Sequence, residues 1–228
     1  MPGISIVVTA WNNTNYLEEC LDSIVKQDFK GEYEVLLGID CCEKTRDKFL
    51  TLRDKNKYKN FKAYYMTENK GTYVTTNTLI SFSKYDIILR FDSDDVMMPE
   101  MLSSIYTTFS TYNADLVKFK FLNFNEHRRW MGVPSAGVMA YTRELYYKVG
   151  GYKPWRCAAD SDFLKRILAV GINVKTLNTP LFLRRSHSES LTNKIDTGFR
   201  SELRRGYNKI MAKGFEKIVP EINKADLL

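Results

Sequence analysis

The sequence predicts a single α/β domain, Rossmann-like in plan, in which helices flank a mostly parallel mixed sheet. Two observations lead to this prediction. Short apolar, β-branched segments alternate with segments of helical periodicity along the first half of the chain, a pattern typical of a parallel sheet covered on both faces. The length of 228 residues and the hydrophobic content of 44% suit one full core, because single α/β domains commonly reach this size.

The first half contains four predicted strands. Residues 4–9 form an apolar strand, which the turn-forming run at residues 12–15 separates from a helical pattern beginning at Leu17. The same alternation continues with strands at 34–40, 61–66 and 85–91, and with helices at 43–57, at 72–83 and after Pro99. Ligands bind at the carboxyl ends of the strands in such sheets, so we expect Asp40 and Asp92 to share a site.

The second half has a different pattern. Beyond Ala114 the chain shows longer, aromatic-rich strands, a paired-glycine turn and a further helix, at residues 116–124, 137–142, 150–151 and about 160–170. The tail, residues 199–215, has apolar residues at helical spacing, with arginines and lysines mostly on the other faces. We therefore expect the domain to cover residues 1–195 and residues 196–228 to form a C-terminal basic amphipathic helix.

The chain is basic, with 34 Lys and Arg against 27 Asp and Glu and a net charge of +7. This charge suits a phosphorylated ligand, an anionic membrane surface or nucleic acid equally well. Because no RNP-type aromatic motif or zinc-finger spacing accompanies it, we do not expect nucleic-acid binding. The basic tail helix is most simply a solvated face, and contact with a membrane or a lipid-linked acceptor is the alternative.

The amino-terminal residues and the cysteines indicate the cellular compartment in which we expect the protein. Residues 1–9 have no basic leader and read as a buried strand, not as a signal peptide, and no segment approaches the roughly twenty apolar residues that span a bilayer. Cys20, Cys41, Cys42 and Cys157 lack metal-finger spacing. We expect reduced thiols and a cytoplasmic protein, with peripheral membrane contact as an open alternative.

An acidic cluster follows the fourth predicted strand. Asp92, Asp94 and Asp95 lie within four residues, and such carboxylates repel one another unless a cation neutralises them. A hard divalent ion, Mn²⁺ or Mg²⁺, is the usual remedy and keeps open positions for phosphate oxygens. The alternative is a solvated acidic loop that caps the helix beginning near Pro99. The strand context favours the metal site.

Short motifs occur in a fixed order along the chain. They read V-V-T-A-W-N at 7–12, E-N-K-G at 68–71 with T-N at 76–77, F-D-S-D-D at 91–95 followed by Pro99, G-G-Y at 150–152, A-D-S-D-F-L-K-R at 159–166 and R-R-S-H-S-E-S-L-T at 184–192. This order resembles the family-two glycosyltransferases, which have the GT-A fold. The resemblance runs from Ile4 to about Thr192. It implies an inverting, metal-dependent transfer of a sugar from a nucleotide-sugar, foremost a UDP-sugar, to a hydroxyl of a glycan, glycoprotein or lipid-linked acceptor.

The resemblance also implies a division of labour within the domain. Residues 1–95 would bind the nucleotide-sugar donor and residues 96–195 the acceptor. The implied donor-binding residues are Thr9, Ala10, Trp11, Asn12, Asp40, Asn69, Gly71, Asn77, Asp92, Ser93, Asp94, Arg184 and Arg185. The implied metal ligands are Asp92, Asp94, Asp95 and His187, with Mn²⁺ or Mg²⁺ as the cofactor. Thr76 stands where the family has an arginine.

Asp160 matches the position of the family's catalytic base. Attack by an acceptor hydroxyl on an anomeric carbon needs a group that takes its proton, and direct displacement then inverts the configuration. The family's glutamate before this position is replaced by Ala159, and Asp162 is the reserve base. The alternative for Asp160 is a helix N-cap, and the alternative for His187 is a surface histidine.

Two other function classes remain open at this point. A non-catalytic module that binds nucleotide-sugars or glycans is favoured by the missing glutamate at Ala159. A nucleotidyltransferase would need a Gly-rich, Arg-containing loop after the first strand, and residues 11–14 read W-N-N-T instead. The transferase interpretation therefore leads.

Overall fold

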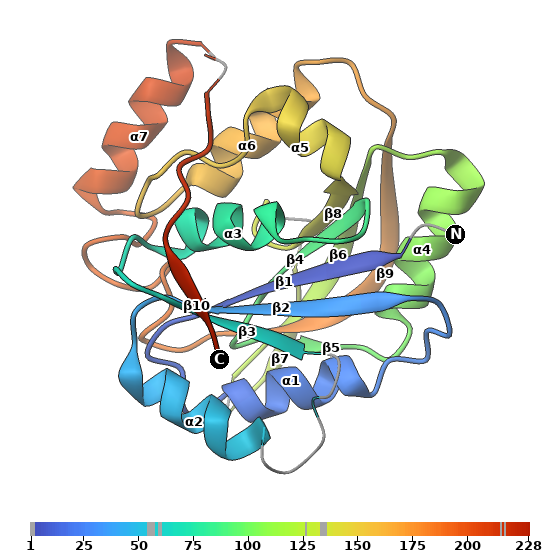
Figure 1. Ribbon diagram of the computed structural model, residues 1–228. Coiled ribbons are helices and arrows are strands. Elements are labelled where there is room, and N and C mark those ends of the chain that lie inside the picture. Colours follow the sequence, from blue (N-terminus) through green and yellow to red (C-terminus); the bar gives the residue numbers. More distant parts are fainter. Residues whose placement is uncertain are drawn as a thin grey trace.

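The computed structural model describes residues 3–53, 58, 61–125, 127–132, 136–214, 216 and 218–228. In this part of the chain, one twisted sheet runs through the molecule, and helices cover both of its faces (Figure 1). The strands follow the order β10-β3-β2-β1-β4-β8-β6-β9-β5, and β7 pairs with β6 outside this path. The predicted fold class, a mixed sheet flanked by helices, is confirmed.

The first half forms the parallel part of the sheet. Strands and helices alternate as predicted: β1 (Ile4–Ala10), α1 (Leu17–Val25), β2 (Tyr33–Ile39), α2 (Glu43–Arg53), β3 (Phe61–Met66), α3 (Thr72–Ser81) and β4 (Ile87–Asp92). β1 pairs in parallel with β2 on one side and β4 on the other. The predicted continuation of α2 through residues 54–57 lies outside the described residues.

The second half extends the sheet with strands of both directions. Its elements are β5 (Val96–Met97), α4 (Met101–Tyr112), β6 (Leu116–Phe124), β7 (Arg129–Gly132), β8 (Met139–Thr142), α5 (Arg143–Val149), α6 (Ala159–Leu168), β9 (Val174–Arg185), α7 (Glu202–Ala212) and β10 (Ala225–Leu227). β8 runs antiparallel to β4, whereas β6 and β9 are parallel to each other. The sequence analysis missed α5, β5, β7 and β10, and of β9 only the run at residues 181–183 resembles a strand in the sequence.

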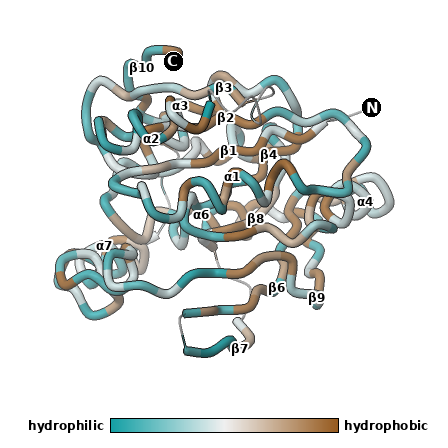
Figure 2. The backbone as a smooth tube through the Cα atoms, turned by 90° about the horizontal axis from the view of Figure 1, so that it is seen from below, coloured by the Kyte–Doolittle hydropathy of each residue, from teal (hydrophilic) through white to brown (hydrophobic). Residues whose placement is uncertain are grey.

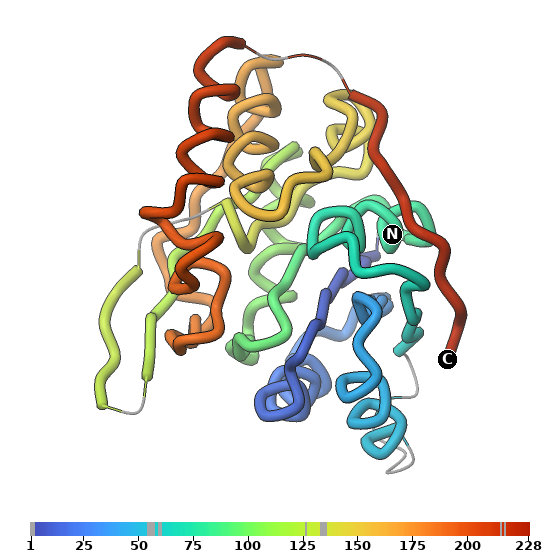
Figure 3. Tube along the Cα trace, turned by 90° about the vertical axis from the view of Figure 1, so that its left-hand side faces the viewer, coloured from blue at the N-terminus to red at the C-terminus, as the bar shows by residue number. Residues whose placement is uncertain are grey.

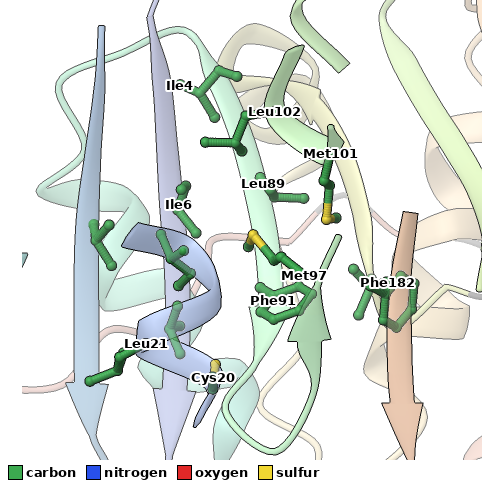
Figure 4. Close-up of a cluster of buried hydrophobic side chains, with 14 of the residues drawn as sticks. Ile4, Ile6, Cys20, Leu21, Leu89, Phe91, Met97, Met101, Leu102 and Phe182 are labelled. Carbon is green, nitrogen blue, oxygen red and sulfur yellow. The ribbon is translucent and has the colours of Figure 1, made fainter. Parts of the chain in front are cut away.

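Two hydrophobic clusters fill the space on either side of the sheet. Alternate residues of β1 serve both, since Ile4 and Ile6 face the cluster under α1, α2 and α4, whereas Val7 faces the cluster under α3, α5 and α6. Figure 4 shows part of the first cluster, in which Leu21 of α1 and Leu102 of α4 lie against the strands. The strands are buried on both faces, which explains why they read as continuous apolar runs. In Figure 2 the hydrophobic colouring gathers on these central strands.

The paired glycines end α5, as their turn signal predicted. Gly150 has φ +85°, the left-handed conformation that glycine adopts without strain. A Cβ atom at Gly150 would lie 1.8 Å from the carbonyl oxygen of Ile218. Only glycine therefore lets the carboxyl-terminal segment cross here.

The tail contains more than the predicted helix. α7 covers residues 202–212 of the expected 199–215, of which Phe215 lies outside the described residues. Its Tyr207 stacks on Trp155, which lies in the segment before α6. The chain then returns across the molecule, and β10 joins the edge of the sheet antiparallel to β3 (Figure 3). Among the helices of the described ranges, none has the length and apolar character needed to cross a bilayer. All four cysteines are free thiols.

Candidate active site

The polar residues of the candidate site gather at the carboxyl edge of the parallel strands. Thr9 of β1 is level with Gly38 of β2 and with Asp92 of β4. The sheet register thus brings the residues that follow these three strands to one edge, as the sequence analysis expected. The amino-terminal turns of α3 and α6 and the end of β9 complete this edge.

Asp40 organises the loop between β3 and α3. Its side chain is buried, Oδ1 accepts a hydrogen bond from the backbone N–H of Lys70 at 3.1 Å, and Oδ2 accepts one from the N–H of Gly71 at 2.9 Å. Burial raises the pKa of the Asp40 carboxyl, and these two N–H groups oppose the shift. The structure therefore uses Asp40 to shape the loop that carries Asn69 and Gly71.

Arg156 is a residue of this site that the sequence analysis missed. Its guanidinium donates to the side-chain oxygen of Asn69 at 2.9 Å, and a Cβ atom at Gly71 would lie 3.2 Å from the same guanidinium. Arg156 is exposed and precedes α6. Thr76, which stands in α3 where the family has an arginine, is fully buried. Arg156 instead supplies a cation beside the loop that precedes α3. No local signal marks Arg156, because the contact joins residues far apart in the sequence.

The residues at the end of β1 and directly after it lie in different environments. Trp11 is 49% exposed, and the ammonium of Lys194 lies 4.9 Å from its ring centroid. Asn12 has φ 50°, whereas Ala10 is buried in the core. The hydroxyl of Thr9 lies 2.6 Å from that of Thr72 at the start of α3. Trp11 is therefore the residue of this group that offers an open apolar surface to a ligand.

The carboxylates of the acidic cluster point in different directions. Asp92 forms an ion pair of 2.7 Å with the buried Arg90. Asp95 is buried and accepts a hydrogen bond from the backbone N–H of Arg185 at 2.9 Å. Burial raises the pKa of Asp95 well above its usual value, and the charges of Asp94 and Asp92 raise it further. Asp95 thus secures the end of β9 and does not face the surface.

Asp94 and His187 contact each other at the partly exposed side of the site. The Nε2 atom of His187 lies 2.8 Å from Oδ2 of Asp94, and both side chains are partly exposed. Within the described ranges no group of three acidic, histidine or cysteine side chains is close enough to hold a metal. A divalent ion that takes most of its ligands from phosphate oxygens needs only one or two protein ligands, so Asp94 and His187 fit that arrangement.

The neighbouring polar residues hold this loop in place. The side chain of Asn13 donates to the backbone oxygen and the hydroxyl of Ser93. Arg185 donates to the backbone oxygen of Asp94 at 3.0 Å, pairs with Glu19 and lies over two aromatic rings. The guanidinium of Arg184 lies 5.0 Å from the ring centroid of Phe121. Because Arg185 is bonded within the protein, its fixed contacts do not match the donor contact that the resemblance implied.

Asp160 lies in the first turn of α6. Its Oδ1 accepts hydrogen bonds from the hydroxyl of Tyr73 at 3.0 Å and from the N–H of Ser161 at 2.8 Å. The N-cap of α6 is Ala158, so the helix-cap alternative does not describe Asp160. The structure brings Asp160 to the same edge as Asp92, since Tyr73 also lies against Arg90.

Two predicted site residues have internal roles instead. Asp162 is fully buried and forms ion pairs with Arg166 at 2.7 Å and with Lys153 at 3.0 Å. Asn77 is buried too, and its side-chain amide makes four hydrogen bonds inside the protein. Neither side chain is therefore free for a ligand. Asp162 does not fit the expected role of reserve base, and Asn77 does not fit the expected donor contact.

Comparison with known proteins identifies relatives of this chain. The family described as "Glycosyl transferase family 2" matches residues 5–168. Poly(ribitol-phosphate) beta-N-acetylglucosaminyltransferase TarS of Staphylococcus aureus is 29% identical over 139 residues, which are 60% of this chain and 23% of TarS. Poly(ribitol-phosphate) beta-glucosyltransferase of Bacillus spizizenii is 32% identical over 137 residues, which are 58% of this chain and 20% of that protein. The chain thus spans about a fifth of the length of these relatives.

Solved structures share the architecture. The crystal structure of S. aureus TarS 1-349 in complex with UDP-GlcNAc has a TM-score of 0.71 and 21% identity, with 82% of this chain and 59% of that chain covered. Mannosyltransferase PcManGT from Pyrobaculum calidifontis, in complex with GDP-Man and Mn²⁺, has a TM-score of 0.73 and 16% identity, with 93% and 65% covered. These similarities establish the GT-A fold.

The buried ion pairs of Asp162 predict a stability test. Asp162→Asn should lower the free energy of unfolding by about 3 to 5 kcal/mol, because it leaves Arg166 and Lys153 without their counter-charge. Asp160→Asn, the matched control two residues away, should change it by less than about 1 kcal/mol. Urea denaturation measures both. Equal losses in the two variants would contradict the structural role assigned to Asp162.

Proposed function

The chain belongs to glycosyl transferase family 2, and we propose that it is an inverting glycosyltransferase that moves a sugar from a nucleotide-sugar to an acceptor hydroxyl. One observation carries the proposal: Asp160 and the acidic cluster meet at the edge where ligands of such sheets bind. Tyr73 links them, because its hydroxyl bonds Asp160 and its ring lies 5.6 Å from the guanidinium of Arg90, which pairs with Asp92.

The donor is a UDP-sugar in this proposal. S. aureus TarS, which shares the fold, has been crystallised with UDP-GlcNAc and with UDP. In this chain the exposed ring of Trp11 and the loop held by Asp40 offer a surface for the nucleotide base. Arg156 and Lys194 add positive charge beside these groups, which suits a diphosphate.

Asp94 and His187 are the proposed metal ligands and would hold a Mn²⁺ or Mg²⁺ ion. The mannosyltransferase PcManGT, which shares the fold, has been solved in complex with GDP-Man and Mn²⁺. When bound, the ion would offset the charge that develops on the departing diphosphate. Asp92 is held by Arg90 and contributes negative charge at the same edge.

Asp160 is the proposed base. A carboxylate at the start of α6 takes the proton of the acceptor hydroxyl, while the hydroxyl oxygen bonds to the anomeric carbon and the bond to the diphosphate breaks. Because the nucleophile enters opposite the leaving group, configuration at that carbon inverts. The acceptor is a hydroxyl of a glycan, glycoprotein or lipid-linked saccharide; the relatives named above act on poly(ribitol phosphate).

A donor panel tests the proposed function directly. We expect the protein to release a nucleoside diphosphate from at least one of UDP-GlcNAc, UDP-glucose, UDP-galactose and GDP-mannose when Mn²⁺ is present. Chelation by EDTA should reduce the rate at least about 100-fold, because the charge on the leaving group is then uncompensated. A folded protein that neither binds nor cleaves any of these donors would sink the proposal.

Removal of the base separates an enzyme from a binding module. Asp160→Asn should lower kcat about 100-fold to 10,000-fold, the usual contribution of a general base, and should leave the affinity for UDP and Mn²⁺ unchanged within about 2-fold, since Asp160 acts on the acceptor. The exposed Asp47→Asn is the control and should match the wild type. If wild type and Asp160→Asn both bind UDP and neither turns over a donor, the non-catalytic module is the better description.

Helix α7 supports a second, independent proposal of peripheral contact with an anionic membrane. Its neighbourhood exposes Phe199, Leu203 and Ile210, and Arg205 and Lys209 lie exposed on the same helix. Apolar side chains beside a basic face suit the interface of an anionic bilayer. In the cell this contact would place the enzyme on the cytoplasmic side, where nucleotide-sugars are available.

Liposome flotation tests this contact. At low salt the protein should float together with vesicles that contain phosphatidylglycerol. With vesicles of phosphatidylcholine alone it should stay at the bottom of the gradient, because the attraction is electrostatic. The double variant Arg205→Glu with Lys209→Glu should abolish flotation. A double variant of equal charge change on other elements, Lys30→Glu with Lys44→Glu, should retain it. Absence of binding by the wild type removes the membrane proposal.

A further inference from the structure

The proposed mechanism gives no chemical role to the buried hydroxyl of Tyr73. Tyr73 is the second residue of α3, only 5% exposed, and belongs to the hydrophobic cluster under α3, α5 and α6. A phenylalanine would fill the same volume there. Burying a hydroxyl costs free energy unless it finds a hydrogen-bond partner. The partner of this hydroxyl among the described residues is Oδ1 of Asp160, at 3.0 Å.

The packing around Tyr73 fixes the direction of that hydroxyl. One face of the ring stacks on Tyr152, with centroids 5.8 Å apart, and the guanidinium of Arg90 lies 5.6 Å from the ring centroid. Tyr152 and Arg90 are themselves buried. Burial and the carboxylate of Asp160 raise the pKa of Tyr73 well above its usual value, so the phenol keeps its proton and acts as the donor.

The two oxygens of Asp160 consequently differ. Oδ1 accepts from the Tyr73 hydroxyl and from the Ser161 N–H. Oδ2 has no hydrogen-bond donor among the residues that the structure describes, and the side chain is partly exposed. With Oδ1 held by two donors, rotation of the carboxylate is restricted, and Oδ2 is the oxygen with free acceptor capacity.

We propose that Tyr73 is a positioning residue for sugar transfer, which holds Asp160 through Oδ1 so that Oδ2 takes the proton from the acceptor hydroxyl. The inference rests on the proposed function and adds to it a residue outside the motifs. In the step, the acceptor O–H bond breaks and its proton passes to Oδ2. The acceptor oxygen bonds to the anomeric carbon, and the electron pair of the broken glycosyl bond leaves with the diphosphate.

The position of Tyr73 also connects the base to the donor side. It follows Gly71, whose N–H bonds Asp40, by two residues. Its neighbour Thr72 contacts both Thr9 and Arg90. One helical turn at the start of α3 therefore sets the donor loop on one side and the base on the other, so a displacement of this turn moves both.

The test is Tyr73→Phe, which removes a single oxygen atom and preserves the ring. We expect kcat with the donor that the wild type uses to fall roughly 10-fold to 100-fold, the effect of losing a hydrogen bond to a charged group. The donor KM and the affinity for UDP with Mn²⁺ should change by less than about 2-fold, because the lost bond acts on the acceptor's proton. Steady-state kinetics and calorimetry provide these values.

Tyr141→Phe is the matched control. It also removes a buried hydroxyl from the same cluster, one that lies 3.0 Å from the hydroxyl of Tyr152 and bonds no carboxylate of the described residues. This variant should keep kcat within about 2-fold of wild type while losing a similar amount of thermal stability. A kcat of Tyr73→Phe no lower than that of Tyr141→Phe overturns the inference. So does a loss of UDP affinity as large as the loss of kcat, since Tyr73 would then only support the donor loop.

The wild type distinguishes this inference from the proposed function. A wild type without turnover of any donor in the panel contradicts the proposed function and, with it, the role of Tyr73. A wild type that is active, with an equally active Tyr73→Phe, contradicts only the role of Tyr73.

Discussion

Parallel hydrogen bonding of β1 to β2 on one side and to β4 on the other aligns the ends of three strands, and each acidic group of the site is positioned relative to that alignment. In a parallel ladder the carboxyl ends of neighbouring strands must share one edge. Asp40 and Asp92 are therefore brought to opposite sides of the residues that end β1. The loops that follow need only short excursions to place their polar groups together.

Concentrating carboxylates at this edge has an electrostatic cost, and the protein offsets it with different partners for each group. Asp40 receives two backbone N–H groups, Asp92 a buried arginine and Asp95 the N–H of Arg185. Asp92, Asp94 and Asp160 are partly exposed, and the contact of each with its partner side chain engages one carboxylate oxygen. The proposed mechanism gives a metal ion to Asp94 and a proton to Asp160, whereas the charge of Asp92 is already paired with that of the buried Arg90.

Motif order identified the right region, but it could not separate residues that face a ligand from residues that hold the region together. Asn77 and Asp162 lie in matching motifs and are nevertheless bonded inside the protein. A motif records residue identity and spacing, whereas orientation depends on what packs nearby. For Asp162 that environment is Lys153 and Arg166, which neutralise it in the core. For Asn77 it is the chain crossing near Tyr152 and the carboxyl-terminal segment.

The sequence by itself determined the order of strands and helices in the first half, the edge at which the acidic residues gather, and the family. The first two follow from local periodicity, because a strand buried on both faces must be apolar throughout and a helix between strands must be amphipathic. The family follows from the order of the short motifs. Only the tertiary structure decided that Arg156 reaches Asn69, that Tyr73 bonds Asp160 and that β10 extends the sheet. Each of these contacts joins segments that are distant in the chain. Which residues meet depends on how the elements pack, and the local periodicity of either segment does not indicate it.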